Sequence, residues 1–160
     1  MASVETTADA TILVVEDEEL ARLIVCDYLK EGGFAVLEAS NAEHAIAILE
    51  QRADVRAAVL DVVMPGAMDG IALAHLIHAR WPRIGLLVLS GKGVPRMAQL
   101  PPGTGFLPKP YFGPSIVDRV RAIISPDREA WHERRSSWRG SCFLRHRPIR
   151  WIVDRRCFCP

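Results

Sequence analysis

Residues 57–61 of the chain read AAVLD, four apolar residues that end at a carboxylate. An uninterrupted apolar run of this length predicts a strand that is buried on both faces, as in a parallel sheet covered by helices. The sequence continues as PGAMDG at residues 65–70, which is typical of a turn into a helix. We therefore expect a strand, a loop that starts at Asp61 and a helix, in that order.

The same alternation of strand and helix extends in both directions. Further strands are predicted at residues 11–15, 34–39, 84–89 and 106–107, and helices at residues 20–30, 41–52, 71–80 and 115–124. The proline-bordered stretch 93–100 has room for only about two helical turns. This alternation implies a parallel sheet with helices on both faces. The predicted fold class is α/β, a flavodoxin-like doubly wound five-stranded parallel sheet of order 2-1-3-4-5 with a reduced fourth helix.

Side-chain spacing predicts two further details of the helices. Leu20, Leu23 and Ile24 follow a 3.6-residue rhythm and are expected to form the apolar face of the first helix. Ser40 and Glu43 stand at capping-box spacing, which indicates that the second helix begins near Asn41.

Length and composition limit the class of protein. A chain of 160 residues with 49% hydrophobic and 24% charged residues is expected to form one domain with an ordinary core. The longest apolar runs are strand-sized, so no membrane span is predicted, and residues 1–10 do not resemble a secretory signal. Four irregularly spaced cysteines make no disulfide framework, which favours a reducing, cytoplasmic location.

The net charge of +1 hides a difference between two parts of the chain. Residues 1–125 carry 11 Lys and Arg against 15 Asp and Glu, a net charge of −4, whereas residues 126–160 carry 9 Arg against 4 acidic residues, a net charge of +5. We expect a disordered N-terminus at residues 1–10 and one domain at residues 11–125. The remainder is expected to be a basic tail rich in Arg, Trp and Cys, disordered or partly helical.

The tail is open to several interpretations. Its Arg and Trp residues could bind phosphates and stack on bases. A membrane-contacting amphipathic helix would be interrupted by Pro148. The possible metal ligands match no familiar zinc spacing; they are Cys142, His146, Cys157 and Cys159.

Polar residues collect at one edge of the predicted sheet. They follow or end four of its strands, and they are Glu16, Asp17, Asp61, Ser90 and Lys109. Because the first and third strands are neighbours in the predicted order, three carboxylates are expected within a few ångströms of one another. Their repulsion is relieved by a hard divalent cation with oxygen ligands, and Mg²⁺ fits best because it commonly serves phosphate chemistry.

Such a cluster favours phosphoryl transfer. Asp61 can act as a nucleophile and form an aspartyl phosphate, while Lys109 neutralises charge on the transferring oxygens. The Ser90 hydroxyl can donate a hydrogen bond to one of those oxygens once the group has arrived.

Four segments of the chain resemble the receiver domain of two-component response regulators. They are ILVVEDE at residues 12–18, AVLDVVMPGAMDG at 58–70, LLVLSG at 86–91 and FLPKPY at 106–111. The resemblance covers residues 11–125. It implies that Asp61 accepts a phosphoryl group from a sensor histidine kinase or a histidine phosphotransfer protein.

The resemblance also implies roles for the other site residues. Asp17 and Asp61 would bind Mg²⁺ directly, Glu16 would bind it through water, and the backbone carbonyl of Val63 would be a further ligand. By the same resemblance, Ser90 would be the hydroxyl switch and Phe106 the aromatic residue that changes rotamer on phosphorylation. Lys109 would bind the phosphoryl group, and its peptide bond to Pro110 would be cis.

The chain departs from the family pattern in several ways. The loop after Asp61 is one residue longer than the commoner form, and Phe106 lacks the hydroxyl of a tyrosine switch. Glu16 replaces the more frequent aspartate but keeps its charge. A reduced fourth helix would alter the surface that receivers usually present to dimer partners or targets.

Three functions are therefore weighed. The leading one is a phosphorelay component that catalyses only its own phosphoryl transfer and dephosphorylation and signals to an unknown downstream protein. The second is a nucleic-acid-binding regulator that uses residues 126–160. The third, a metal-dependent phosphohydrolase, is disfavoured because no second acid stands two residues after Asp61 to protonate a leaving group.

Overall fold

The computed structural model describes residues 10–64, 66–91 and 99–125. Strands and helices alternate along these residues in the following order: β1 (Thr11–Val15), α1 (Glu19–Glu31), β2 (Ala35–Ala39), α2 (Ala42–Gln51), β3 (Val55–Asp61), α3 (Gly70–Arg80), β4 (Gly85–Ser90), β5 (Gly105–Pro108) and α4 (Gly113–Ile124).

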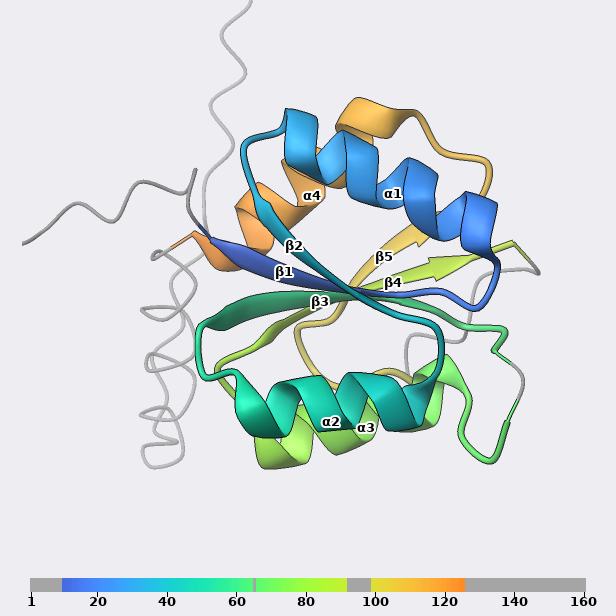
Figure 1. The fold of residues 1–160 in the computed structure, drawn as a ribbon, viewed down its shortest axis with the longest axis vertical. Helices are drawn as coiled ribbons and strands as arrows, with labels where there is room; N and C mark the ends of the chain where they lie inside the picture. Colours follow the sequence, from blue (N-terminus) through green and yellow to red (C-terminus); the bar gives the residue numbers. More distant parts are fainter. Residues whose placement is uncertain (1–9, 65, 92–98, 126–160) are drawn as a thin grey trace, which may run out of the picture. The chain divides into compact units, whose positions relative to one another are not determined.

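The strands form one parallel sheet in the order β2-β1-β3-β4-β5, as Figure 1 shows. Helices α1 and α4 cover one face of the sheet and helices α2 and α3 cover the other. The predicted α/β class and strand order are thus confirmed. The reduced fourth helix was predicted at residues 93–100, of which 93–98 lie outside the described part, so the label α4 denotes the helix after β5.

Burial on both faces explains why β1, residues 57–60 of β3 and residues 86–89 of β4 are continuously apolar. Alternate residues of a strand point to opposite faces, so both sets must pack against helices in a covered sheet. On the side of α2 and α3 the core includes Leu13, Val15, Ala58, Leu60, Leu73 and Ile77. On the side of α1 and α4 it includes Ile12, Val14, Val25, Leu29, Val59, Ile116 and Val120.

The buried face of α1 differs from the one predicted. Leu20, Leu23 and Ile24 are exposed at 68%, 42% and 52%, whereas Val25 and Leu29 are fully buried. The helix carries two apolar stripes of equal periodicity, and spacing alone does not say which of them faces the sheet. The expectation of one apolar face on this helix is therefore wrong, because Leu20, Leu23 and Ile24 form a second, exposed stripe.

The start of α2 also needs a correction. The capping side chain is that of Asn41, which accepts a hydrogen bond from the backbone N–H of His44 at 2.8 Å. The helix begins at Ala42, one residue later than a cap at Ser40 would place it. The start of α3 follows the prediction, because Asp69 accepts from the N–H of Ala72 at 2.8 Å.

Strand register sets the positions of the polar residues at the carboxyl edge. Val15 lies opposite Leu60, so the residues that follow them, Glu16 and Asp61, reach the same level. Asp61 in turn lies opposite Leu89, next to Ser90. Because Ser90 lies opposite Pro108, Lys109 extends just beyond it, and the sheet carries all of these side chains to one edge.

Two predicted segments fall largely or wholly outside the described residues. The expected N-terminal segment 1–10 is described only at Ala10, and the basic tail at residues 126–160 is not described. Within the described part, no helix has the length and hydropathy needed to cross a membrane.

Candidate functional site

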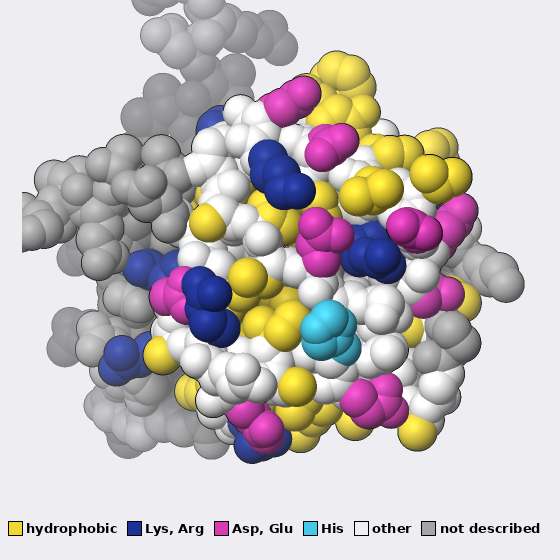
Figure 2. All heavy atoms as spheres, in the orientation of Figure 1, with side chains coloured by type: hydrophobic (Ala, Val, Ile, Leu, Met, Phe, Trp, Pro, Cys, Tyr) yellow, Lys and Arg dark blue, Asp and Glu magenta, His cyan; other side chains and the backbone are white. Residues whose placement is uncertain are grey.

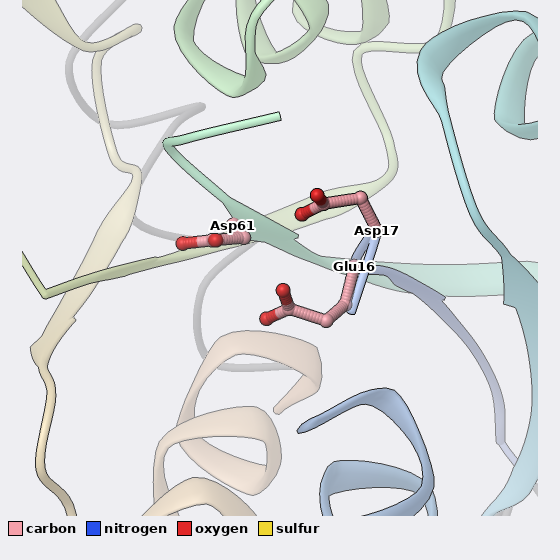
Figure 3. Close-up of side chains that lie close together, drawn as sticks. All are labelled: Glu16, Asp17 and Asp61. Carbon is pink, nitrogen blue, oxygen red and sulfur yellow. The ribbon is translucent and has the colours of Figure 1, made fainter. Parts of the chain in front are cut away.

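Three carboxylates meet at the carboxyl edge of the sheet. One oxygen from each of Glu16, Asp17 and Asp61 lies within 4.8 Å of the other two. Figure 3 shows that Glu16 and Asp17 leave the chain on opposite sides and that both carboxylates lie on the side of Asp61. Glu16 and Asp61 are buried and Asp17 is exposed, so the cluster is open to solvent on one side only.

Lys109, which follows β5 at the same carboxyl edge, pairs with this cluster. Its Nζ donates to Glu16 Oε2 at 2.7 Å and lies 3.4 Å from Asp61 Oδ2. Its backbone N–H donates to the Ser90 carbonyl at 2.7 Å, which fixes the position of the Lys109 backbone beside β4. The peptide bond from Lys109 to Pro110 is cis, as the resemblance implied.

Burial and charge shift the pKa values of this pair. Desolvation raises the pKa of the Glu16 carboxyl above its ordinary value, and the negative charge of Asp61 adds to the increase, although Lys109 opposes it. Desolvation alone would lower the pKa of Lys109, but its hydrogen bond to Glu16 and the charges of Glu16 and Asp61 raise it instead. Lys109 therefore remains a cation beside the two buried carboxylates at neutral pH.

The other predicted residues lie around this cluster. Ser90 is buried at the end of β4, next to the residue that pairs with Asp61. Phe106 on β5 is half-buried and packs against the core on the side of α2 and α3. Val63 follows Asp61 by two residues and is exposed. The metal-binding role of the Val63 carbonyl and the switch roles of Ser90 and Phe106 stay predictions.

Two residues at the site were missed by sequence reasoning. Arg22 of α1 donates from Nη1 to the Glu16 carbonyl at 2.9 Å. Gly70, the first residue of α3, lies so close to the phosphoacceptor candidate that an added Cβ would fall 1.8 Å from the carbonyl oxygen of Asp61. Neither has a sequence signal of its own, because both contacts arise only when the strands and helices are assembled.

Comparison with known proteins decides the family. The family model described as "Response regulator receiver domain" matches residues 12–121 of the chain. The chain belongs to this family. Receiver domains of this family act in two-component phosphorelays, interact with sensor histidine kinases and generally bind Mg²⁺ at an acidic pocket.

The curated relatives that the chain matches are much longer than the matched segment. The sensor kinase CckA of Brucella abortus is 32% identical over 124 residues, which cover 75% of this chain and 13% of the kinase. A putative NtrX-like response regulator of Rickettsia bellii is 36% identical over 83 residues, which cover 51% of this chain and 17% of the regulator. The chain thus spans only a small part of these relatives.

Solved structures share the receiver fold. NtrX from Brucella abortus, solved in complex with ADP, aligns with a TM-score of 0.68 at 26% identity, covering 85% of this chain and 31% of NtrX. A response regulator receiver protein from Sinorhizobium medicae aligns with a TM-score of 0.68 at 24% identity, covering 74% of this chain and 97% of that protein. At that identity the second match supports the fold alone.

Proposed function

We propose that this receiver domain is a phosphoacceptor, and that Asp61 takes a phosphoryl group from a histidine kinase or a histidine phosphotransfer protein. The observation that carries the proposal is the meeting of three carboxylate oxygens within 4.8 Å beside a lysine. Asp61 belongs to the carboxylate cluster and also lies 3.4 Å from Lys109 Nζ.

The donor set fits a hard divalent cation. All three side chains offer oxygen, and the single lysine leaves the cluster with excess negative charge. Asp17 and Asp61 would bind Mg²⁺ directly and Glu16 would bind it through water. The backbone carbonyl of Val63 would be the remaining ligand from the protein. When bound, the ion supplies neutralisation of charge on the transferring phosphoryl oxygens.

The protein's own groups carry the remaining parts of the reaction. An oxygen of Asp61 attacks the phosphorus, and the P–N bond to the donor's imidazole breaks as the O–P bond forms. The electron pair of the broken bond stays on the imidazole nitrogen. Lys109 places its positive charge beside the phosphoryl oxygens, and the Ser90 hydroxyl donates to one of them.

Labelling with a small phosphodonor tests the requirement for the cation. The full chain incubated with acetyl phosphate and Mg²⁺ is expected to gain one phosphoryl group that base and hydroxylamine remove, as for an acyl phosphate. Removal of divalent cations with EDTA is expected to reduce labelling to background, and added Mg²⁺ to restore it. Equal labelling with and without Mg²⁺ would refute the metal part of the proposal.

Exposed hydrophobic side chains lie on elements that follow the strand ends at the carboxyl edge of the sheet. Among the residues that the structure describes, the large exposed hydrophobic ones are Leu20, Leu23, Ile24, Val63 and Phe112, here called the hydrophobic rim. They lie on α1 and in the loops that follow β3 and β5, all of which begin near the carboxyl edge of the sheet. Figure 2 shows hydrophobic side chains gathered over the first half of α1 and the start of α4, with acidic side chains nearby.

The rim fits a docking surface for the phosphodonor protein. Asp61 is only 7% exposed, so a donor must approach closely along this edge to bring its phosphohistidine within reach. Contiguous exposed apolar surface commonly marks a protein interface. The acidic residues Glu18, Glu19 and Asp27 lie on or beside the same part of α1 and favour a donor with basic residues around its histidine.

A substitution in the rim should separate docking from chemistry. Ile24→Asp is expected to slow phosphotransfer from a sensor kinase that labels the wild-type chain by about tenfold, because truncating or charging a central apolar anchor typically costs more than 1 kcal/mol. Labelling by acetyl phosphate should be unchanged, since that donor needs no docking. The control Ala47→Asp adds the same charge at an exposed position of α2 and should affect neither. Equal loss in both variants would contradict a docking role for the rim.

Signalling beyond Asp61 is proposed to occur through protein contacts in the cytoplasm. The comparisons do not favour the alternative of a nucleic-acid-binding regulator, and residues 126–160, on which it depends, lie outside the described part of the chain.

A further inference from the structure

Arg22 connects three elements at the edge of the site. It lies in the first turn of α1, and its side chain is only 16% exposed. Its Nη1 donates to the carbonyl oxygen of Glu16 at 2.9 Å, and its Nε lies 3.5 Å from Glu38 Oε2 on β2. The guanidinium therefore joins the loop after β1 to the neighbouring strand.

The carbonyl that Arg22 binds belongs to the peptide unit between Glu16 and Asp17. The N–H of Glu16 donates to the Ala39 carbonyl at 3.2 Å, so the main chain of Glu16 is held on both sides. A change in the backbone torsion angles that flank the next peptide unit would move the Asp17 side chain relative to that of Glu16. In Figure 3 these two side chains diverge and still bring their carboxylates to Asp61, which depends on the orientation of that peptide unit.

We infer that Arg22 is a positioning residue that sets the orientation of the Glu16–Asp17 peptide and thereby the affinity of the carboxylate cluster for a divalent cation. The inference rests on the proposed function for the identity of the cation. Arg22 suits this role because its planar, forked donors can hold a carbonyl and a carboxylate at the same time in a fixed geometry.

Whether removal of Arg22 weakens or strengthens Mg²⁺ binding distinguishes a positioning role from a purely electrostatic one. Arg22 carries a positive charge close to a proposed cation site, so its removal would strengthen Mg²⁺ binding if charge alone mattered. Loss of positioning would weaken binding instead. Replacing residues that orient metal ligands typically costs 10- to 100-fold in metal affinity, so Arg22→Met is expected to raise the Mg²⁺ dissociation constant by about tenfold.

The experiment measures Mg²⁺ binding to the full chain by calorimetric titration, with unfolding followed in parallel. Arg80→Met is the matched control, because Arg80 pairs with Glu50 at 2.9 Å and stacks on Trp81 away from the site. It should leave the Mg²⁺ affinity unchanged. Arg22→Lys keeps the charge and one donor and should recover part of the affinity. An unchanged or tighter dissociation constant in folded Arg22→Met, or the same loss in Arg80→Met, would overturn the inference.

Two further measurements cover the cases in which Arg22→Met does not fold or the wild-type chain binds no Mg²⁺. If Arg22→Met does not fold, Arg22→Gln is the second variant, because its shorter side chain cannot bridge the Glu16 carbonyl and Glu38 as the guanidinium does. Mg²⁺ binding of wild-type strength in folded Arg22→Gln would overturn the inference. If the wild-type chain binds no Mg²⁺, the proposed metal fails rather than the positioning role. The NMR chemical shifts of the Glu16 and Asp17 backbone amides then test the positioning role. They should change in metal-free Arg22→Met and stay unchanged in Arg80→Met.

Discussion

Asp61→Asn is expected to abolish phosphoryl labelling of the chain, both from acetyl phosphate and from a sensor kinase. A carboxamide has nearly the volume of a carboxylate but lacks its nucleophilic anionic oxygen, so no acyl phosphate can form. The variant should fold, because Asp61 belongs to neither apolar core cluster and the carboxamide nearly keeps its volume. The measurement is incorporation of the phosphoryl group over time at saturating Mg²⁺.

The control for this substitution is Asp118→Asn. Asp118 is an exposed aspartate on α4, so the same chemical change there should leave labelling at the wild-type rate. Labelling that persists in Asp61→Asn would show that another residue is the acceptor. Loss of labelling in both variants would point to a general defect and not to the chemistry of Asp61.

Gly70→Ala is expected to destabilise the fold strongly. In an ordinary helix the change from glycine to alanine is stabilising by about 1 kcal/mol. Here the new Cβ would lie 1.8 Å from the carbonyl oxygen and 2.8 Å from the carbonyl carbon of Asp61, both backbone atoms of a central strand that cannot move aside as a side chain could. We expect a loss on the order of 3 kcal/mol in the free energy of unfolding, at the upper end of overpacking effects.

Urea-induced unfolding of Gly70→Ala measures this loss. Gly91→Ala is a suitable control, because among the described residues its Cβ would meet only the Lys109 side chain, at an ordinary contact distance of 3.8 Å. Its free energy of unfolding should stay within about 1 kcal/mol of the wild-type value. A Gly70→Ala protein of wild-type stability would show that α3 does not approach Asp61 as closely as described here.

Much of the fold could be predicted because each strand is marked by its own residues. A strand buried on both faces must be apolar throughout, and that requirement made β1, β3 and β4 visible in the sequence. The burial of α1 could not be predicted in the same way. Leu20, Leu23 and Ile24 have the same periodicity as the buried Val25 and Leu29, and only packing against the sheet and α4 distinguishes the two stripes.

The site was predictable to the extent that it depends on strand ends. In a parallel sheet the residues after each strand share one edge, which brought Glu16, Asp61 and Lys109 together before any coordinates were known. Arg22 escaped prediction because an arginine on a helix surface is usually solvated, and its contact with the Glu16 carbonyl depends on how α1 packs beside β2. The preference of Lys109 for Glu16 over Asp61 also required the distances.

The central claim is that Asp61 forms an acyl phosphate in a reaction that needs Mg²⁺. It is tested most directly by treating the full chain with acetyl phosphate and Mg²⁺, reducing the product with borohydride to trap the acyl phosphate, and locating the modified residue by peptide mass spectrometry. A single reduced residue is expected, at Asp61, and it should be absent when Mg²⁺ is omitted. Modification at another residue, or none at all in a folded chain with Mg²⁺ present, would contradict this claim.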